Sequence, residues 1–207
     1  MEIVIVSKTR MGKGKTCIGG ITFPHLQSVR LLNKDGSYQS GATEFEIGQT
    51  WDIDFQAAPK IIKPHTEDIH ILSKKKLTKK QFNNYDWLVD QKQIKDRVWR
   101  GSAKELFNKL VKWTGNRNGY ISKPNVPEVS TGFWIPDKEL KFSDKHFTYR
   151  SDGLIKQNFN LAYVGFEKPI ESIEAGTIVR ISLAKWWRPE DADIEERCYL
   201  QLSGWYE

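Results

Sequence analysis

The chain has 207 residues, of which 39% are hydrophobic and 28% charged, which is the composition of an ordinary globular protein and not of a disordered or fibrous one. A formal net charge of +6 favours polyanionic partners. Cys17 and Cys198 are its only cysteines, which excludes a secreted disulfide framework. No run approaches the roughly 20 apolar residues of a membrane-spanning helix. We therefore expect a cytoplasmic protein without a membrane partner.

The N-terminal part of the chain shows the alternation and turn signals of short β-strands. Strands are predicted at residues 2–6 (EIVIV), 16–21, 28–32 and 69–72. The clearest alternation lies in residues 46–55 (EIGQTWDIDF), where hydrophobic and polar side chains face opposite ways. Several short strands separated by glycine-rich turns predict a small β-barrel or sandwich.

The middle of the chain changes to a helical pattern. Thr78 with Gln81, and Ser102 with Glu105, both fit the capping box that opens a helix. After Ser102 the hydrophobic residues keep helical spacing. We therefore predict a helical connector over residues 76–124.

Strands return in the last third. The aliphatic side chains of the predicted strand 177–186 face one way: Val179, Ile181 and Leu183. Because neighbouring residues of a strand point to opposite faces, we expect Trp187 in the core beside them and Trp186 on the outer face. The outer face of the last two strands then carries Arg180, Trp186, Arg197, Tyr199, Gln201 and Trp205. The alternative is that the connector helices cover this face and make all the rings core.

The predicted fold class is mainly β with an α connector. Two small β-barrels, at residues 1–75 and 125–207, are joined by the helical segment 76–124.

A glycine-rich loop near the N-terminus suggests a phosphate site. The stretch IVIVSKTRMGKGKT (residues 3–16) is similar to the phosphate-binding loop of nucleoside triphosphatases. That motif needs a glycine where Thr9 stands and a helix after the loop, whereas CIGGI follows here, so we predict no hydrolysis. A basic loop that only contacts phosphates fits better, and a plain solvated loop is the alternative. Its cations are Lys8, Arg10, Lys13 and Lys15.

Metal-binding and catalytic motifs are weak. Neither cysteine has a second cysteine nearby and the four histidines are scattered, whereas zinc sites pair their ligands at short spacing. No spacing singles out Cys17 and His25 as nucleophile and base. The acids of residues 190–196 have the pattern of a solvated turn. We expect no metal, no cofactor and no enzymatic activity.

The predicted connector is basic. Residues 60–113 contain 14 Lys and Arg against six Asp and Glu. Such an excess indicates either a solvated helix surface or a track that complements a phosphate backbone.

Both ends of the chain resemble the dual OB-containing domain family. The resemblance rests on SKT (7–9), CIGG (17–20) and SVRLL (28–32), and more specifically on AGTIVRISLAKWWRP (175–189) with ERCYLQLSGW (196–205). It implies two OB-like barrels in a bacterial protein of an anti-phage defence setting, with nucleic-acid or nucleotide recognition presumed from the fold. It implies no catalytic residues.

These observations favour a non-catalytic module that binds single-stranded RNA or DNA, or a nucleotide. The residues expected to form its stacking platform and flanking cations are Arg180, Trp186, Arg188, Arg197, Tyr199 and Trp205. One alternative is a protein-interaction module whose aromatic face docks another defence component. The other is an enzyme that acts on nucleotides.

Overall fold

The computed structural model describes residues 1–152, 155–190 and 193–206, without the side chains of residues 78–80. The chain divides into two compact units, Met1–Asp96 and Arg97–Glu207. Strands dominate both units, so the prediction of a mainly β protein is confirmed. The boundary falls between the predicted barrels, inside the segment assigned to the connector.

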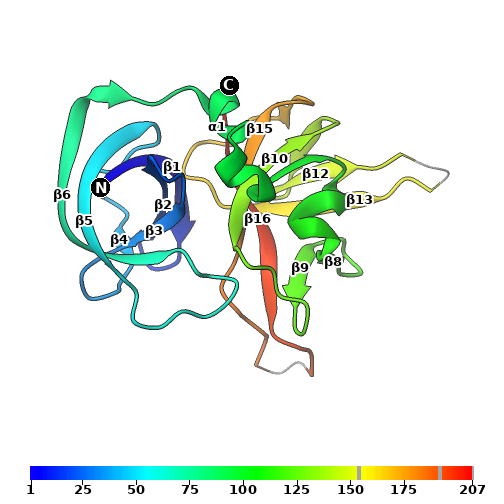
Figure 1. Cartoon of the computed structure of the whole chain (residues 1–207). Coiled ribbons are helices and arrows are strands. Elements are labelled where there is room, and N and C mark those ends of the chain that lie inside the picture. Colours follow the sequence, from blue (N-terminus) through cyan, green and yellow to red (C-terminus); the bar gives the residue numbers. More distant parts are fainter. Residues whose placement is uncertain (153–154, 191–192, 207) are drawn as a thin grey trace. The chain divides into compact units, whose positions relative to one another are not determined.

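Strand pairing closes the first unit into a barrel (Figure 1). Its strands are β1 (Glu2–Met11), β2 (Lys15–Phe23), β3 (Ser28–Leu32), β4 (Gln39–Ser40), β5 (Gln49–Ala57) and β6 (Asp68–Gln81). β1 pairs with β2 and β5, β2 with β3, and β5 with β6, all antiparallel, while β3 and β6 run parallel. The circuit β1–β2–β3–β6–β5–β1 is therefore closed, and β4 extends the sheet at β2. Five strands in this Greek-key order form an OB-fold.

The interior of this barrel holds the hydrophobic side chains that alternation predicts. Trp51 and Ile53 of β5 are buried in it, while Asp52 and Asp54 are exposed. The other buried members of the core are Ile3, Ile5, Ile18, Val29, Leu31, Phe45, Ile69 and Ile71. β5 thus turns one face to the barrel interior and an acidic face to solvent, whereas β1 buries hydrophobic side chains on both faces, with Val4 and Val6 outside this core.

The first predicted helix begins later than the sequence indicates. β6 continues to Gln81, so the capping box at Thr78 does not open a helix. The short helix α1 (Tyr85–Val89) begins instead after Asn84, whose Oδ1 accepts a hydrogen bond from the backbone N–H of Trp87 at 3.1 Å. The pairing of β6 with β5 is a tertiary interaction that local helix signals do not report.

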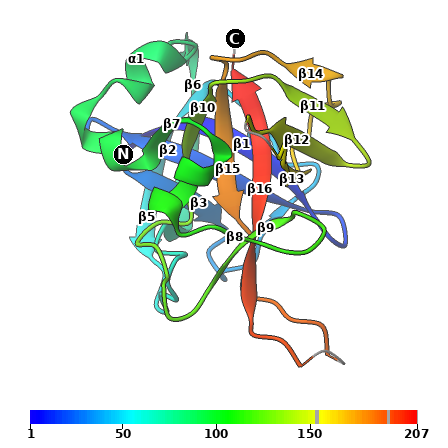
Figure 2. The ribbon, with the colours of Figure 1, turned by 90° about the vertical axis from the view of Figure 1, so that its right-hand side faces the viewer.

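The second unit is built on a larger sheet. Its strands are β7 (Val98–Gly101), β8 (Lys112–Trp113), β9 (Gly119–Ser122), β10 (Thr131–Pro136), β11 (Leu140–Ser143), β12 (His146–Arg150), β13 (Asn158–Tyr163), β14 (Ser172–Ile173), β15 (Ile178–Leu183) and β16 (Arg197–Tyr206). Figure 2 shows β15 beside β16, with β8 and β9 near the lower half of β16. The main sheet has the order β14–β11–β12–β13–β16–β15–β10–β7.

The pairings of the second unit repeat those of the first. β11 with β12, β12 with β13, β16 with β15, and β15 with β10 are antiparallel, while β13 and β16 run parallel. When β10 and β11 are counted as one strand interrupted by residues 137–139, this is the same succession as in the first barrel. β7 and β14 then extend its edges.

The predicted helical connector is not confirmed. Within residues 76–124 the helices besides α1 are the short 3-10 segments η1 (Lys92–Arg97) and η2 (Ala103–Lys109). Ser102 does cap η2, because its Oγ accepts a hydrogen bond from the backbone N–H of Lys104 at 3.3 Å. Phe107 and Asn108 then take the left-handed conformation, at φ of 50° and 57°, which ends regular helix. None of the helices among the described residues is long and apolar enough to cross a membrane.

The core of the second unit contains the aliphatic face predicted for its last two strands. Val179, Ile181 and Leu183 of β15 are buried in it, together with Leu200 and Leu202 of β16. Aromatic side chains supply much of the remaining volume, among them Trp99, Phe107, Trp134, Phe147, Tyr149 and Phe159.

We expect Leu202→Ala to destabilise the protein by about 2–5 kcal/mol, because it leaves a cavity in a packed core. Gln201→Ala, one residue away on the opposite face of β16, is the matched control and should change the unfolding free energy by less than about 0.5 kcal/mol. Urea unfolding of both variants measures this difference. Equal losses would contradict the assignment of faces on β16.

Candidate functional site

The glycine-rich loop is a β-hairpin turn and not a phosphate-binding loop. β1 and β2 pair from Glu2 with Phe23 to Met11 with Lys15, so only residues 12–14 lie between the strands. Lys15 begins β2, and no helix follows it. The helix N-terminus that holds phosphates in nucleoside triphosphatases is therefore missing, as predicted.

The four cations assigned to this loop do not form one group. Lys8 lies on β1 and is buried, and its Nζ is 2.7 Å from Glu46 Oε1. Arg10, Lys13 and Lys15 are exposed at or near the turn. The loop therefore offers fewer phosphate contacts than the sequence indicates.

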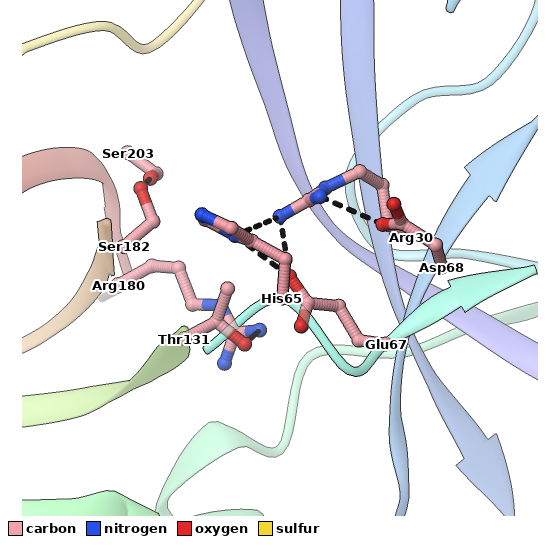
Figure 3. A network of polar contacts seen from close by, with 8 residues as sticks. All are labelled: Arg30, His65, Glu67, Asp68, Thr131, Arg180, Ser182 and Ser203. Carbon is pink, nitrogen blue, oxygen red and sulfur yellow. Dashed lines mark hydrogen bonds and ion pairs between the residues drawn. The ribbon is translucent and has the colours of Figure 1, made fainter. Parts of the chain in front are cut away.

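Arg30 is the centre of a buried charged network in the first unit (Figure 3). It lies on β3 between the core residues Val29 and Leu31, so its side chain leaves the barrel on the outer face. Its Nη1 donates to Asp68 Oδ1 at 2.7 Å, and its Nη2 forms an ion pair with Glu67. This arginine is only 7% exposed.

His65 completes the network from the segment between β5 and β6. Its Nδ1 lies 3.3 Å from Arg30 Nη2 and 3.9 Å from Glu67 Oε1. Arg30 thus already faces two carboxylates and an imidazole of its own unit. A guanidinium neutralised in this way is poorly suited to binding a phosphate.

The two thiols are held in their protonated form. Burial raises the pKa of the Cys17 thiol, whose neighbours include Arg30 and Glu67. Burial also raises the pKa of the Cys198 thiol, to about 12. Because the thiolate is the nucleophile, neither environment activates its cysteine.

The prediction of which neighbouring tryptophan faces the core of the second unit and which faces outwards is wrong. Trp186 packs against the hydrophobic core, whereas Trp187 is 53% exposed. β15 ends at Leu183, and the next backbone pair joins Trp187 to Arg197 in an isolated bridge. Leu183 pairs with Leu200, and Trp187 pairs with Arg197. Between these two pairs the chain advances four residues from Leu183 to Trp187 but only three from Arg197 to Leu200, so the first segment contains one extra residue. Because one extra residue moves the following side chains to the opposite face, Trp186 faces the core and Trp187 faces outwards.

Trp205 is also displaced from the predicted outer face. The register of β15 and β16 shifts between Arg180, which pairs with Gly204, and Ile181, which pairs with Leu202. Ser203 is the extra residue of this bulge. Trp205 consequently pairs with Val179, packs against the core, and has its ring centroid 5.9 Å from that of Tyr163.

The predicted arginines differ in their availability. Arg180 does lie opposite the aliphatic face of β15, but it is buried, with Nη2 donating to Thr131 Oγ1 at 2.9 Å (Figure 3). Its guanidinium also lies 4.7 Å from the ring centroid of Phe133. Arg188 is exposed, next to Trp187 in the chain.

An aromatic patch with an arginine forms on the outer face of β9 and β16. We define it by Trp187, Tyr199, Tyr120 and Arg197 and call it the aromatic patch. The ring centroids of Trp187 and Tyr199 are 6.0 Å apart, and those of Tyr199 and Tyr120 are 6.2 Å apart. The Arg197 guanidinium lies 4.1 Å from the Tyr120 ring centroid, which is cation–π distance.

Strand pairing builds this patch from segments far apart in the sequence. β9 and β16 place Tyr120 opposite Tyr199. Trp187 is held by two backbone hydrogen bonds to Arg197, of 3.0 and 2.9 Å. The predicted residues Arg197 and Tyr199 are therefore together, Trp187 takes the place given to Trp186, and Tyr120 was missed. A tyrosine after a glycine in a short strand carries no signal of its own.

The described residues contain no cluster of three or more His, Cys, Asp and Glu side chains that could hold a metal ion. The chemistry that the patch offers is instead that of flat rings and a fixed cation. Such a surface can stack a planar group and neutralise a nearby anion.

The structure is that of a mainly β protein with OB-type strand pairing and an aromatic surface on its second unit. A family model for the dual OB-containing domain matches residues 1–205, and the chain belongs to this family. No curated protein and no solved structure matches it.

We expect Glu67→Ala to destabilise the protein by about 3–5 kcal/mol, because it leaves a buried guanidinium with half of its carboxylate partners. Glu139→Ala is the control: Glu139 Oε2 lies 3.5 Å from Lys141 Nζ in an exposed pair, and such pairs contribute about 0–1 kcal/mol. Chemical unfolding of both variants tests this prediction. A loss for Glu67→Ala no larger than that of the control would show that the network is solvated.

Proposed function

We propose that the protein binds single-stranded nucleic acid, RNA or DNA, through the aromatic patch of its second unit, without reacting with it. The observation that carries the proposal is the exposure of Trp187 at 53%, beside Tyr199 and close to a cation. Exposing a large ring to water forgoes the stabilisation that its burial gives. A flat ligand that covers the ring recovers that stabilisation.

The place of the patch in the fold supports this proposal. In the succession of pairings shared by the two units, β15 and β16 take the places of the fourth and fifth OB strands. The segment between them, residues 184–196, carries Trp187, and OB-folds use this connection to bind oligonucleotides. Exposed aromatic rings beside cations are the combination that sequence-tolerant single-strand binders use.

The first unit is assigned a secondary role. Arg30, on the outer face of β3, is already paired with Glu67 and Asp68. Lys13 and Lys15 are exposed at the β1–β2 turn, which is the other connection that OB-folds use for ligands. In this proposal the turn contributes phosphate contacts and no base-binding site.

A single nucleotide and a protein partner are the alternative ligands of the same patch. The row of rings from Trp187 to Tyr120 favours a ligand with more than one base, because each ring can take one flat group. The anti-phage setting that the family resemblance implies stays a prediction.

The first experiment is the absorbance of the purified full chain. Co-purified nucleic acid raises the 260/280 nm ratio, and nuclease treatment should lower it. Fluorescence anisotropy with a labelled oligothymidylate and a labelled oligouridylate then measures binding directly. The proposal is refuted if the protein carries no nucleic acid and neither oligomer binds at low salt.

Substitution of the neighbouring tryptophans should separate binding from folding. We expect Trp187→Ala to weaken oligonucleotide binding by about 1–3 kcal/mol, as the loss of a stacking ring does, with an unchanged melting temperature. Trp186→Ala should lower the melting temperature, because Trp186 packs against the core. Anisotropy titrations and thermal melts of the two variants give the comparison.

Trp87 provides a matched control for exposure. It is 43% exposed in the first unit, where its ring stacks on Phe23. Trp87→Ala should leave oligonucleotide binding unchanged. An equal loss of binding in Trp87→Ala and Trp187→Ala would contradict a binding site centred on the aromatic patch.

A further inference from the structure

A cleft lined by charged and polar residues lies on the second unit. It has a volume of about 410 Å³ and is lined by Lys138, Glu139, Lys141, Thr148, Arg150 and Asn158. We call it the basic cleft. Three of its lining residues are cationic and one is acidic, and this excess of positive charge favours anions.

Alternation fixes the basic cleft on the outer face of β11, β12 and β13. Phe147 and Tyr149 of β12 are buried in the core, so Thr148 and Arg150 point the other way. The strand register places Arg150 opposite Asn158 and Thr148 opposite Lys141. Four of the lining residues therefore lie on neighbouring strands of the sheet, while Lys138 and Glu139 come from the short connection between β10 and β11.

The cations of the basic cleft differ in the ion pairs that they form with other residues. Lys138 forms an ion pair with Asp152, and Lys141 Nζ lies 3.5 Å from Glu139 Oε2. Both pairs include a well-exposed partner, and exposed pairs are weak. Within the described part of the chain, Arg150 forms no ion pair and its side chain makes no hydrogen bond. An exposed guanidinium in a cleft is suited to bidentate binding of a phosphate.

A polar ladder connects the basic cleft to the aromatic patch. Thr148 Oγ1 donates to Asn160 Oδ1 at 2.9 Å, and Asn160 Nδ2 donates to the backbone oxygen of Asn116 at 3.1 Å. The backbone N–H of Asn160 also donates to the backbone oxygen of Arg117, an exposed cation, at 2.8 Å. From there the chain enters β9, which carries Tyr120 of the patch.

We infer that the basic cleft binds the phosphodiester backbone of the same strand whose bases stack on the aromatic patch. This inference rests on the proposed function and makes it more specific: the ligand is an oligonucleotide and not a mononucleotide. In the main sheet β13 lies between β12, which carries Arg150, and β16, and β9 pairs with the part of β16 that carries Tyr199. Two strand spacings, about 10 Å, are therefore the least lateral separation of the two subsites, and a ligand must cross at least one intervening strand to reach both.

The test is the salt dependence of binding of the full chain to a labelled oligothymidylate of about 16 nucleotides, the upper end of the length that one OB-fold covers. Each phosphate contact on a single strand contributes a slope of about −0.7 to the dependence of log K on log salt. Arg150→Ala should make the slope less steep by about 0.7, and Arg150→Ala with Lys141→Ala by about 1.4. Lys34→Ala removes an exposed charge from a turn of the first unit and should leave the slope unchanged.

Competition with thymidine monophosphate completes the test. We expect it to displace the oligomer only at concentrations far above those at which an unlabelled oligomer does so. Equal displacement at equal phosphate concentration overturns the inference, because the cleft then binds an isolated phosphate.

The two proposals fail in different ways. A wild-type slope in Arg150→Ala, combined with lost binding in Trp187→Ala, overturns the inference and leaves the proposed function intact. Absence of binding by the unaltered chain at low salt overturns both. The melting temperature of Arg150→Ala should equal that of the wild type because its side chain is exposed, so a folding defect does not imitate the expected result.

Discussion

The register between β15 and β16 decides which side chains of the second unit are available to a ligand. Their pairing shifts by one residue at Ser203, and the chain beyond β15 gains one residue before the bridge between Trp187 and Arg197. A slip of one residue moves a side chain to the other face of a sheet. The first irregularity turns Trp205 towards the core, and the second packs Trp186 against the core and exposes Trp187. The aromatic patch is therefore a consequence of backbone hydrogen bonding.

The two units use the same succession of strand pairings for different purposes. In the first unit, the segment between β5 and β6 returns His65 and Glu67 to the outer face of β3, where they meet Arg30. In the second unit, the corresponding segment between β15 and β16 presents Trp187 and leaves it exposed. A shared fold thus does not give a shared site, because the side chains of one connection decide whether the neighbouring face is neutralised or open.

The sequence predicts well those features that depend on neighbouring residues of one strand. Alternation locates the buried Trp51 and Ile53 on β5 and the aliphatic face of β15. It fails where pairing with another strand changes the register or the length of a strand. Examples are the two irregularities between β15 and β16 and the continuation of β6 to Gln81. Of the predicted platform, Arg197 and Tyr199 stay together because they share β16. Tyr120 joins them only through the pairing of β9, which no local pattern reports.

Whether a cation can bind a phosphate depends on the free energy needed to break its existing ion pair. Arg30 is held by Glu67 in a buried pair, and separating buried pairs costs about 3–5 kcal/mol. Arg197 Nε lies 3.7 Å from the half-exposed Glu195, and Lys141 is paired in solvent, where such contacts contribute about 0–1 kcal/mol. A phosphate can replace these weak partners but not the buried ones. The net charge of the whole chain therefore does not show which cations can exchange partners: Arg30 is held by buried carboxylates, whereas Lys141 and Arg197 are not.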